Sequence, residues 1–267
     1  MHIYRTLITA AIAASFSIPA FAKIEDSKAG GALGGSGELF WAIIDQEGER
    51  SYTRDLGISL DNFLAATATG QSWSFANDAT LLEFISGTAN PGSLIWNIGA
   101  LDSTGTGTGN FQKFLSTFAQ GATLPTFSNL IIGQLDDSAD IFLGGTNALE
   151  SHLSQENGSN IATAADGSAY AAVNWGTNFG GKASGFFNGM ALDDTASLIL
   201  IRQSSNVFAQ RFNQGIVSEI SHNGLVYTAS FDGNALNIAA IPEPSTYAMM
   251  GVGIAALGFA ARRRNKR

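Results

Sequence analysis

The chain has 267 residues, enough for one sizeable domain with targeting segments at its ends. Its 31 glycines and 13% charged residues are typical of a turn-rich β protein. Residues 23–241 carry eight basic and 21 acidic side chains, and this charge of −13 argues against nucleic acid and anionic membrane surfaces as partners. Cysteine is absent, which excludes thiol catalysis, cysteine metal sites and lipoprotein attachment.

Residues 1–22 have the pattern of a secretory signal peptide. A short basic start precedes an apolar stretch at residues 6–18, which we expect to form the signal helix. Ala20 and Ala22 then provide the small-x-small pattern of a signal-peptidase site, so cleavage is expected after Ala22. The alternative, an uncleaved membrane helix, is disfavoured because the stretch is short and Pro19 ends it.

The remainder of the chain before the C-terminal segment is expected to form one exported domain. Residues 23–37 are polar and glycine-rich, which predicts a flexible lead-in. Residues 38–240 contain many short apolar or alternating segments separated by glycine and Asx turns, which predicts a mainly β domain. We expect an antiparallel β-sandwich or jelly roll with a few short helices at its ends.

The individual elements follow from apolar periodicity and turn residues. The hairpin at residues 216–231 has the strongest signal, because Asn223 and Gly224 separate two alternating segments. An amphipathic helix is expected at residues 110–120, and residues 122–165 favour neither helix nor strand clearly. Other strands are expected at residues 38–44, 51–54, 71–75, 93–101, 168–175, 183–187 and 197–202, and short helices at 59–64 and 81–85.

One glycine-rich segment has the setting of a phosphate-binding loop. Gly105, Gly107 and Gly109 follow an expected strand and precede an expected helix. The segment lacks the Gly-Lys-Ser/Thr of a P-loop, and its third glycine is misplaced for a dinucleotide site. A flexible surface loop is therefore the simpler interpretation.

Two groups of aspartates have oxygen ligands of the kind that calcium requires. Asp136, Asp137 and Asp140 form the first group, but their spacing matches no known calcium loop. We interpret them, together with Asp193 and Asp194, as solvated loop residues. No metal and no cofactor is therefore expected.

A hydrolase would need two placed carboxylates, or a serine with a histidine and an acid. After the signal peptide the chain contains two histidines, His152 in a polar stretch and His222 beside the expected turn. The sequence has no Gly-x-Ser-x-Gly elbow and no His-x-x-x-His pair. A carboxylate pair that forms only in three dimensions keeps an exported glycosidase open as an alternative.

The four tryptophans are candidates for stacking on sugar rings. Trp41, Trp73, Trp96 and Trp175 all lie in strand-like segments with apolar neighbours. Core packing is the expected role for such residues. A tryptophan on a loop or concave face would instead indicate carbohydrate binding.

The C-terminal segment combines an apolar run with a basic end. Residues 246–261 have no charged side chain and would extend about 24 Å as a helix, close to the roughly 30 Å of a hydrocarbon core. We therefore expect a transmembrane helix there. The basic tail, residues 262–267, begins with Arg262, Arg263 and Arg264 and is expected to stay in the cytoplasm, which places the domain across the membrane.

The segment before the apolar run is expected to be extended and exposed. Pro242 and Pro244 cannot continue a helix, and each drives the residue before it toward extended geometry. With Glu243 between them, they form a short neck at the membrane surface. A processing enzyme would be able to grip a segment of this shape.

Residues 241–267 together resemble the PEP-CTERM sorting signal of Gram-negative bacteria. Three features match in order at the chain end: Pro242-Glu243-Pro244, a small-residue apolar helix, and an arginine cluster. The resemblance implies recognition by an exosortase, cleavage near the Pro-Glu-Pro segment, and only transient anchoring in the inner membrane. The motif is also labelled an ice-binding protein C-terminal domain, although no residue here indicates ice binding. The body is similar to uncharacterised exported proteins with the same tail, which implies no activity.

These observations lead to three expectations of function. The first is a non-catalytic protein of the cell surface or extracellular matrix, sorted through its tail and associated with exopolysaccharide. The second is a carbohydrate-binding module, which needs an exposed aromatic platform. The third is an exported glycoside hydrolase, which needs two acids in a cleft.

Overall fold

The structure is a computed structural model that describes residues 23–25, 36–66, 70–103, 111–149, 157–176, 178–183, 186–222, 225–242 and 254. The expected signal peptide, with Ala20 and Ala22, therefore lies outside the described residues, as does nearly all of the expected transmembrane segment. In the part that is described, no helix is long and apolar enough to cross a membrane.

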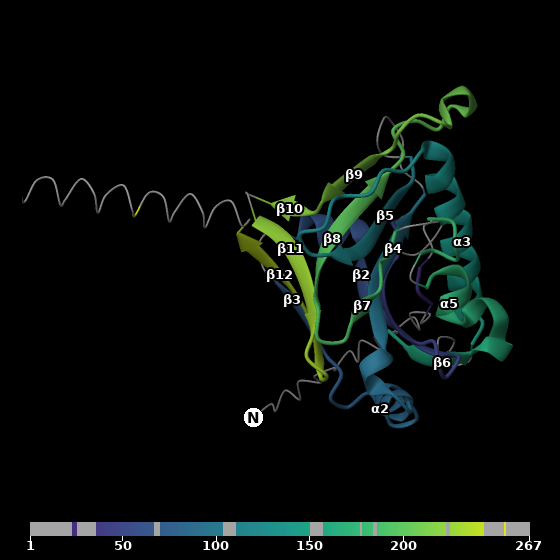
Figure 1. The fold of residues 1–267 in the computed structure, drawn as a ribbon, viewed down its shortest axis with the longest axis vertical. Helices are drawn as coiled ribbons and strands as arrows, with labels where there is room; N and C mark the ends of the chain where they lie inside the picture. Colours follow the sequence, from purple (N-terminus) through teal and green to yellow (C-terminus); the bar gives the residue numbers. More distant parts are fainter. Residues whose placement is uncertain are drawn as a thin grey trace, which may run out of the picture.

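The domain is built on one antiparallel sheet whose strand order is β3-β12-β11-β8-β5-β4-β1-β2-β6 (Figure 1). Three short strands attach to this path, with β10 on β11, β7 on β4 and β9 on β8. The strands are β1 (Glu38–Asp45), β2 (Arg50–Ser59), β3 (Gln71–Ser74), β4 (Ile95–Asp102), β5 (Lys113–Ala119), β6 (Ser159–Thr163), β7 (Met190–Ala191), β8 (Thr195–Arg202), β9 (Ile216–Glu219), β10 (Ser221–His222), β11 (Leu225–Phe231) and β12 (Ala235–Pro242).

Helices connect the strands and cover parts of the sheet. They are α1 (Leu60–Ala65), α2 (Ala79–Ser86), α3 (Asn129–Asn147) and α5 (Ala171–Asn174), with 3₁₀ turns η1 (Pro91–Ser93), η2 (Ala164–Ala169) and η3 (Phe208–Gln210). Side chains of Ser59, Asp78 and Ser128 accept backbone N–H groups at the starts of α1, α2 and α3. These caps satisfy donors that a helix start leaves unpaired and so fix where each helix begins.

The sheet curls so that its inner face closes on itself. The ring of Trp41, on the interior strand β1, stacks on Phe75 at 4.8 Å and lies 4.7 Å from the ring of Phe231 on β11. Strands β4, β5 and β8 separate β1 from β11 in the sheet order, so these contacts cross the hollow of the curl. Leu39 and Ile43 belong to the same inner core.

The outer face of the sheet packs against α3 and α5. Phe40, Ala42 and Ile44 alternate with the inner-core residues along β1 and point into this second core. There the ring of Phe40 meets Trp175 at 4.9 Å and Phe142 of α3 at 5.5 Å. Because both faces of β1 are covered, all eight of its residues are buried.

The structure confirms a mainly β, antiparallel domain with few helices. One curled sheet with a core on each face replaces the two stacked sheets of the expected sandwich or jelly roll. Residues 113–119 form strand β5 where a helix was expected, because neighbours on both sides bury Phe114, Leu115 and Phe118. Residues 171–174, expected to be a strand, form helix α5.

The first described residues are attached to the domain. Ile24 is fully buried in the outer core, its N–H donates to Asn147 Oδ1 at 2.9 Å, and its carbonyl accepts from Asn147 Nδ2 at 2.8 Å. Residues 26–35 of the expected lead-in lie outside the described residues. The chain that follows the predicted signal-peptidase site therefore contributes to the fold from its second residue.

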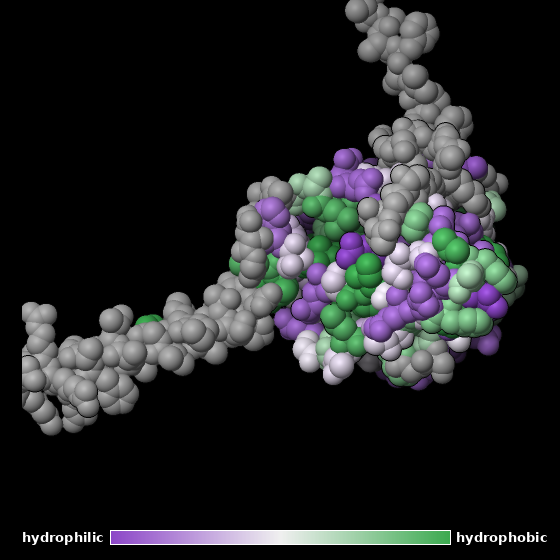
Figure 2. Space-filling view, turned by 90° about the horizontal axis from the view of Figure 1, so that it is seen from above, coloured by the Kyte–Doolittle hydropathy of each residue, from purple (hydrophilic) through white to green (hydrophobic). Residues whose placement is uncertain are grey.

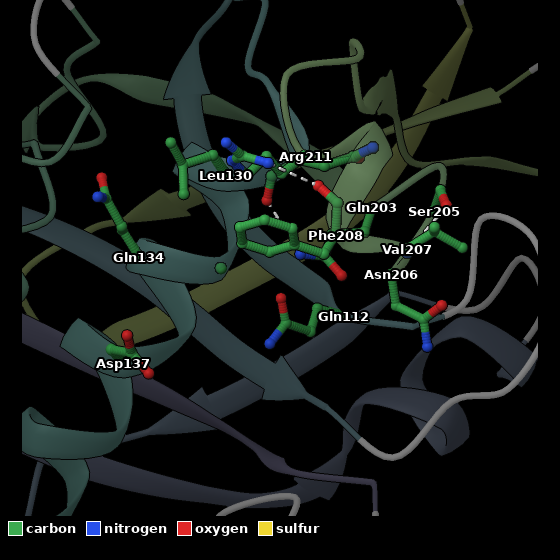
Figure 3. Close-up of a pocket in the computed structure, with 12 residues that line it drawn as sticks. Gln112, Leu130, Gln134, Asp137, Gln203, Ser205, Asn206, Val207, Phe208 and Arg211 are labelled. Atoms are coloured by element: carbon green, nitrogen blue, oxygen red, sulfur yellow. Dashed lines mark hydrogen bonds between the residues drawn. The ribbon is translucent and has the colours of Figure 1, made fainter.

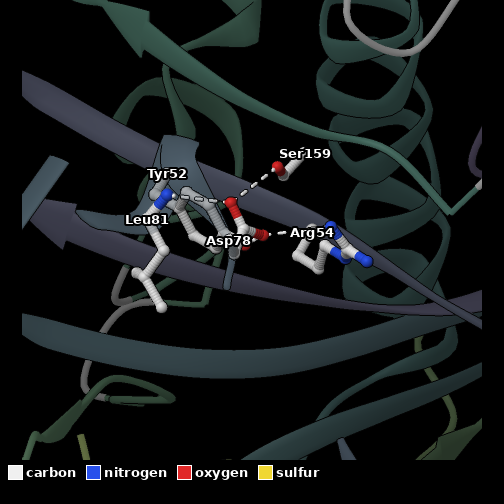
Figure 4. A network of polar contacts seen from close by, with 5 residues as sticks. All are labelled: Tyr52, Arg54, Asp78, Leu81 and Ser159. Carbon is white, nitrogen blue, oxygen red and sulfur yellow. Dashed lines mark hydrogen bonds and ion pairs between the residues drawn. The ribbon is translucent and has the colours of Figure 1, made fainter. Parts of the chain in front are cut away.

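Asp78 joins three elements through one carboxylate (Figure 4). Its Oδ2 accepts the Tyr52 hydroxyl at 2.7 Å and Arg54 Nη1 at 3.0 Å, both from β2. Its Oδ1 accepts the Leu81 N–H of α2 at 3.0 Å and the Ser159 hydroxyl of β6 at 3.3 Å. Burial raises the pKa of Tyr52, and the Asp78 charge adds to this rise. The phenol is therefore a permanent donor to the carboxylate.

A second buried acidic group lies at the start of β1. Glu38 and Glu25 exchange hydrogen bonds, and Asp55 accepts the Gly57 N–H at 2.8 Å. Burial, with the Glu38 charge as the next cause, raises the pKa of Asp55 to about 7. Burial also raises the pKa of Glu38, against the effect of the Glu25 N–H.

Replacing Asp78 with alanine should strongly destabilise the mature protein. The change removes the cap of α2 and leaves the Tyr52 hydroxyl and the partly buried Arg54 without their shared acceptor, which we expect to cost roughly 3 kcal/mol. Urea unfolding measures this cost. Ser59→Ala is the matched control, because it removes a helix cap alone and should cost about 1 kcal/mol. Equal costs for the two variants would show that the network adds nothing beyond the cap.

The acidic group predicts a specific pH dependence. An aspartate whose pKa rises from 3.8 to about 7 on folding makes the folded protein bind more protons, so stability falls as pH rises through this window. Asp55 lowers the free energy of unfolding by at most about 1.4 kcal/mol per pH unit. Asp55→Asn, whose amide oxygen can still accept the Gly57 N–H, should flatten the profile and exceed wild type in stability at pH 8. The exposed Asp193→Asn is the control, and an Asp55→Asn profile parallel to wild type would contradict the assignment.

Candidate functional site

A groove of about 440 Å³ lies where the start of α3 meets the loop between β8 and β9 (Figure 3). This loop, residues 203–215, projects beyond the upper end of α3 in Figure 1. The groove is open to solvent. Its lining consists of Gln112, Asn129, Leu130, Gly133, Gln134, Asp137, Gln203, Ser205, Asn206, Val207, Phe208 and Arg211.

Side-chain amides make up much of the groove wall. Gln203 Nε2 donates to the Asn129 carbonyl at 3.0 Å, and Gln112 Nε2 donates to Asp136 Oδ2 at 2.9 Å. These bonds fix the orientation of both amides. Gln112 Oε1 is buried and has no hydrogen-bond partner among the described residues. Because this oxygen is inaccessible to solvent, a ligand in the open groove does not reach it in this conformation.

The loop is fastened to the helix by backbone and side-chain hydrogen bonds. The N–H groups of Asn129 and Leu130, in the first turn of α3, donate to the carbonyls of Asn213 at 2.9 Å and Arg211 at 2.7 Å. Asn129 Oδ1 accepts the Ser204 N–H at 2.9 Å. The loop therefore satisfies donors that a helix start leaves free, and the helix holds the loop in one shape. The groove is preformed.

Two phenylalanines at the edge of the groove are exposed. Phe208 is 76% exposed and Phe212 is 67% exposed. The Arg211 guanidinium carbon lies 3.9 Å from the Phe208 ring centre and 4.4 Å from that of Phe212. Arg211 Nη1 also donates to the Phe208 carbonyl at 3.1 Å, so the guanidinium orders both rings.

The view from above mixes hydrophobic and hydrophilic residues (Figure 2). The exposed apolar residues of the loop, Val207, Phe208 and Phe212, are accompanied by the polar Asn206 and Gln210. Such a mosaic combines aromatic contact area with hydrogen-bonding groups. Sites that bind amphipathic ligands have this kind of composition.

The first group of aspartates, interpreted from the sequence as solvated loop residues, lies on a helix. Asp136, Asp137 and Asp140 lie on α3 and not in a loop, and Asp136 is buried beside Gln112. Within the described ranges, no three histidine or acidic residues gather as a metal would require. The exposed Asp193 and Asp194 line a second cavity of about 420 Å³ near β7.

The tryptophans considered for sugar stacking do not line the groove. Trp41, Trp96 and Trp175 are fully buried, which confirms their expected packing role. The buried Glu38 and Asp55 pair lines neither of the two cavities. The glycine segment at 105–109 and His152 lie outside the described residues.

Three residues of this loop were not predicted from the sequence as binding candidates: Phe208, Arg211 and Phe212. A signal was present, because the segment from Gln203 to Gly215 is rich in serine, asparagine and glutamine yet contains two phenylalanines. Polar loop composition around large aromatic side chains indicates residues that no core accommodates.

The expected processing segment begins inside the sheet. β12 ends at Pro242, which lies opposite Leu225 of β11, and Ile241 lies opposite Val226. A proline is tolerated at such a strand end because it interrupts no following ladder. Glu243, Pro244, Arg262, Arg263 and Arg264 lie outside the described residues, so their roles stay predictions.

Comparison with known proteins identifies one segment of the chain. No curated protein and no solved structure matches the chain. A family model described as the PEP-CTERM protein-sorting motif matches residues 240–264. This range starts within β12, covers the Pro-Glu-Pro neck and the apolar run, and ends at Arg264. The chain therefore carries a PEP-CTERM protein-sorting motif, the signal that its C-terminal residues resemble.

Proposed function

We propose that this chain is a non-catalytic protein of the cell surface or extracellular matrix that associates with exopolysaccharide. The sorting motif itself establishes the coarser statement, an exported protein that an exosortase-type enzyme processes after transient membrane anchoring. The observation that carries the proposal is that the motif continues directly from the last strand of the sheet. The folded domain is therefore the part of the chain that the sorting motif exports.

The proposed route follows from the order of the C-terminal features. The signal peptide leads the chain across the inner membrane, residues 246–261 then enter the bilayer as the transmembrane helix, and the arginines hold the end in the cytoplasm. Cleavage near Pro242-Glu243-Pro244 would release the domain. A cut after Pro242 leaves all β11–β12 pairs in place, so processing need not disturb the sheet.

The surroundings of the acidic groups support a role without catalysis. Asp137 is the acidic side chain that lines the groove, whereas a glycoside hydrolase requires two carboxyl groups across the substrate. Glu38 and Asp55 do lie near each other, but they are 9% and 3% exposed and cannot meet a polymer in this conformation. The groove and this buried pair therefore do not favour the glycoside hydrolase, which stays the weaker alternative.

Binding of carbohydrate is the second candidate function, and one observation favours it. Phe208 presents an exposed ring beside amide side chains that line an open groove. This combination is the aromatic platform that a carbohydrate-binding module needs. It is compatible with the first proposal, because a protein held in exopolysaccharide requires contacts with sugar.

The sorting route predicts the state of the mature C-terminus. Glu243→Ala combined with Pro244→Ala alters the neck but leaves Pro242 and its strand pairing unchanged. In an exosortase-containing host, the larger part of this variant should remain in the membrane fraction with residues 262–267 attached. Cell fractionation followed by mass spectrometry of the C-terminal peptide measures both properties.

Two controls accompany this experiment. Glu47→Ala removes an exposed glutamate in the β1–β2 turn and should be processed like wild type. A host without exosortase should retain every variant in the membrane. Wild-type protein at the cell surface that still carries Arg262–Arg267 would contradict the route.

A further inference from the structure

We propose that the groove between α3 and residues 203–215 binds a segment of a neutral polysaccharide, with a pyranose ring stacked on Phe208. The inference rests on the proposed association with exopolysaccharide and names its binding site and ligand class. Four features carry it: an exposed ring, side-chain amides held in place, a glycine that leaves the floor open, and the local charge.

Phe208 offers an ordered stacking surface. Its ring is 76% exposed in a protein that buries most of its large aromatic side chains. Arg211 holds it from one side through a contact of 3.9 Å between the guanidinium carbon and the ring centre. An exposed ring of this size lacks the stabilisation of about 1.5–3 kcal/mol that full burial would give. The C–H face of a pyranose would cover the free side of the ring and recover part of this energy.

The amides of the groove match the hydroxyls of a sugar. Gln112 and Gln203 are held by their own hydrogen bonds, so binding would cost little side-chain entropy. The exposed amide of Gln134 also lines the groove, and it can both donate to and accept from sugar hydroxyls.

Gly133 keeps the floor of the groove open. A Cβ atom at this position would lie 3.5 Å from Gln203 Nε2 and 3.7 Å from Gln112 Oε1, so a larger side chain would fill the space between the two amides. Glycine inside a helix costs roughly 0.5–1 kcal/mol relative to alanine. A Cβ would fit here without a clash, so backbone packing does not require the glycine. The glycine leaves the space beside the two amides open.

The charge of the site and of the domain favours a neutral ligand. Among the described residues that line it, the groove has one cation, Arg211, whose guanidinium is occupied by two rings, and one anion, Asp137. The rest of its polar lining is uncharged. The body carries a charge of −13 and repels polyanions. Neutral hexose polymers are therefore a better match than polyuronates.

The experiment measures binding of soluble polysaccharides to the mature protein. Affinity electrophoresis with a neutral glucan, a neutral galactomannan, the host's own extracellular polysaccharide and the anionic polyuronate alginate supplies dissociation constants. We expect binding to at least one neutral polymer and none to alginate. Phe208→Ala and Gly133→Val should each weaken binding about tenfold or more.

Two matched controls lie outside the groove. Phe187→Ala removes an exposed phenylalanine ring at a position that does not line the groove. Gly144→Val introduces the same side chain into α3 at a position where a Cβ meets nothing within 4 Å. Both should bind like wild type. Thermal unfolding of all four variants verifies folding, and Phe208→Ala, at an exposed position, keeps the test valid if Gly133→Val unfolds.

The outcomes separate this inference from the proposed function. If wild type binds polysaccharide and the two groove variants bind equally well, the groove is not the site, although the association stands. If no polymer binds, including the host's own, both the groove and the association are overturned. Preferential binding of alginate, or binding of a protein partner that Phe208→Ala alone abolishes, would also overturn the assignment to a neutral glycan.

Discussion

The burial of β1 on both faces is the constraint on which the rest of the structure depends. Its alternate residues enter two different cores, so the sheet needs a cover on each side. Curling supplies the inner cover, where Trp41 meets the rings of Phe75 and Phe231. Helix α3 supplies the outer cover through Phe142 and its neighbours. The position of α3 is thus a consequence of how a β strand is buried.

The groove follows from that position. Because α3 is fixed on the sheet by its apolar side, its first turn has a fixed place and direction. The unpaired N–H groups of that turn require acceptors, and the carbonyls of Arg211 and Asn213 provide them. The loop that supplies these carbonyls also carries Phe208. Burial of the strand therefore determines where the helix lies, and the helix determines the conformation of the loop. The loop conformation in turn leaves the aromatic ring exposed.

Part of this organisation could be predicted from the sequence and part could not. The strands β1, β4 and β8 and the tail were predictable, because their signals are local runs of residues. Residues 110–120 were misassigned because Phe111, Phe114, Leu115 and Phe118 have helical spacing, whereas burial on both faces of β5 removes the alternation that identifies a strand. The groove joins Gln112, α3 and residues 203–215. No local pattern indicates that segments so distant in sequence meet.

The junction of β12 with the sorting motif relates the fold to the route of the chain. At most four peptide units separate Pro242 from the apolar run at residue 246, or roughly 14 Å of extended chain, so the anchored domain must stay close to the membrane. In Figure 1 the end of β12 and the helix α3 lie on opposite sides of the sheet. The groove at the start of α3 is therefore remote from the tether. A polymer outside the membrane can reach it while the domain is still anchored, and cleavage of the neck leaves its geometry unchanged.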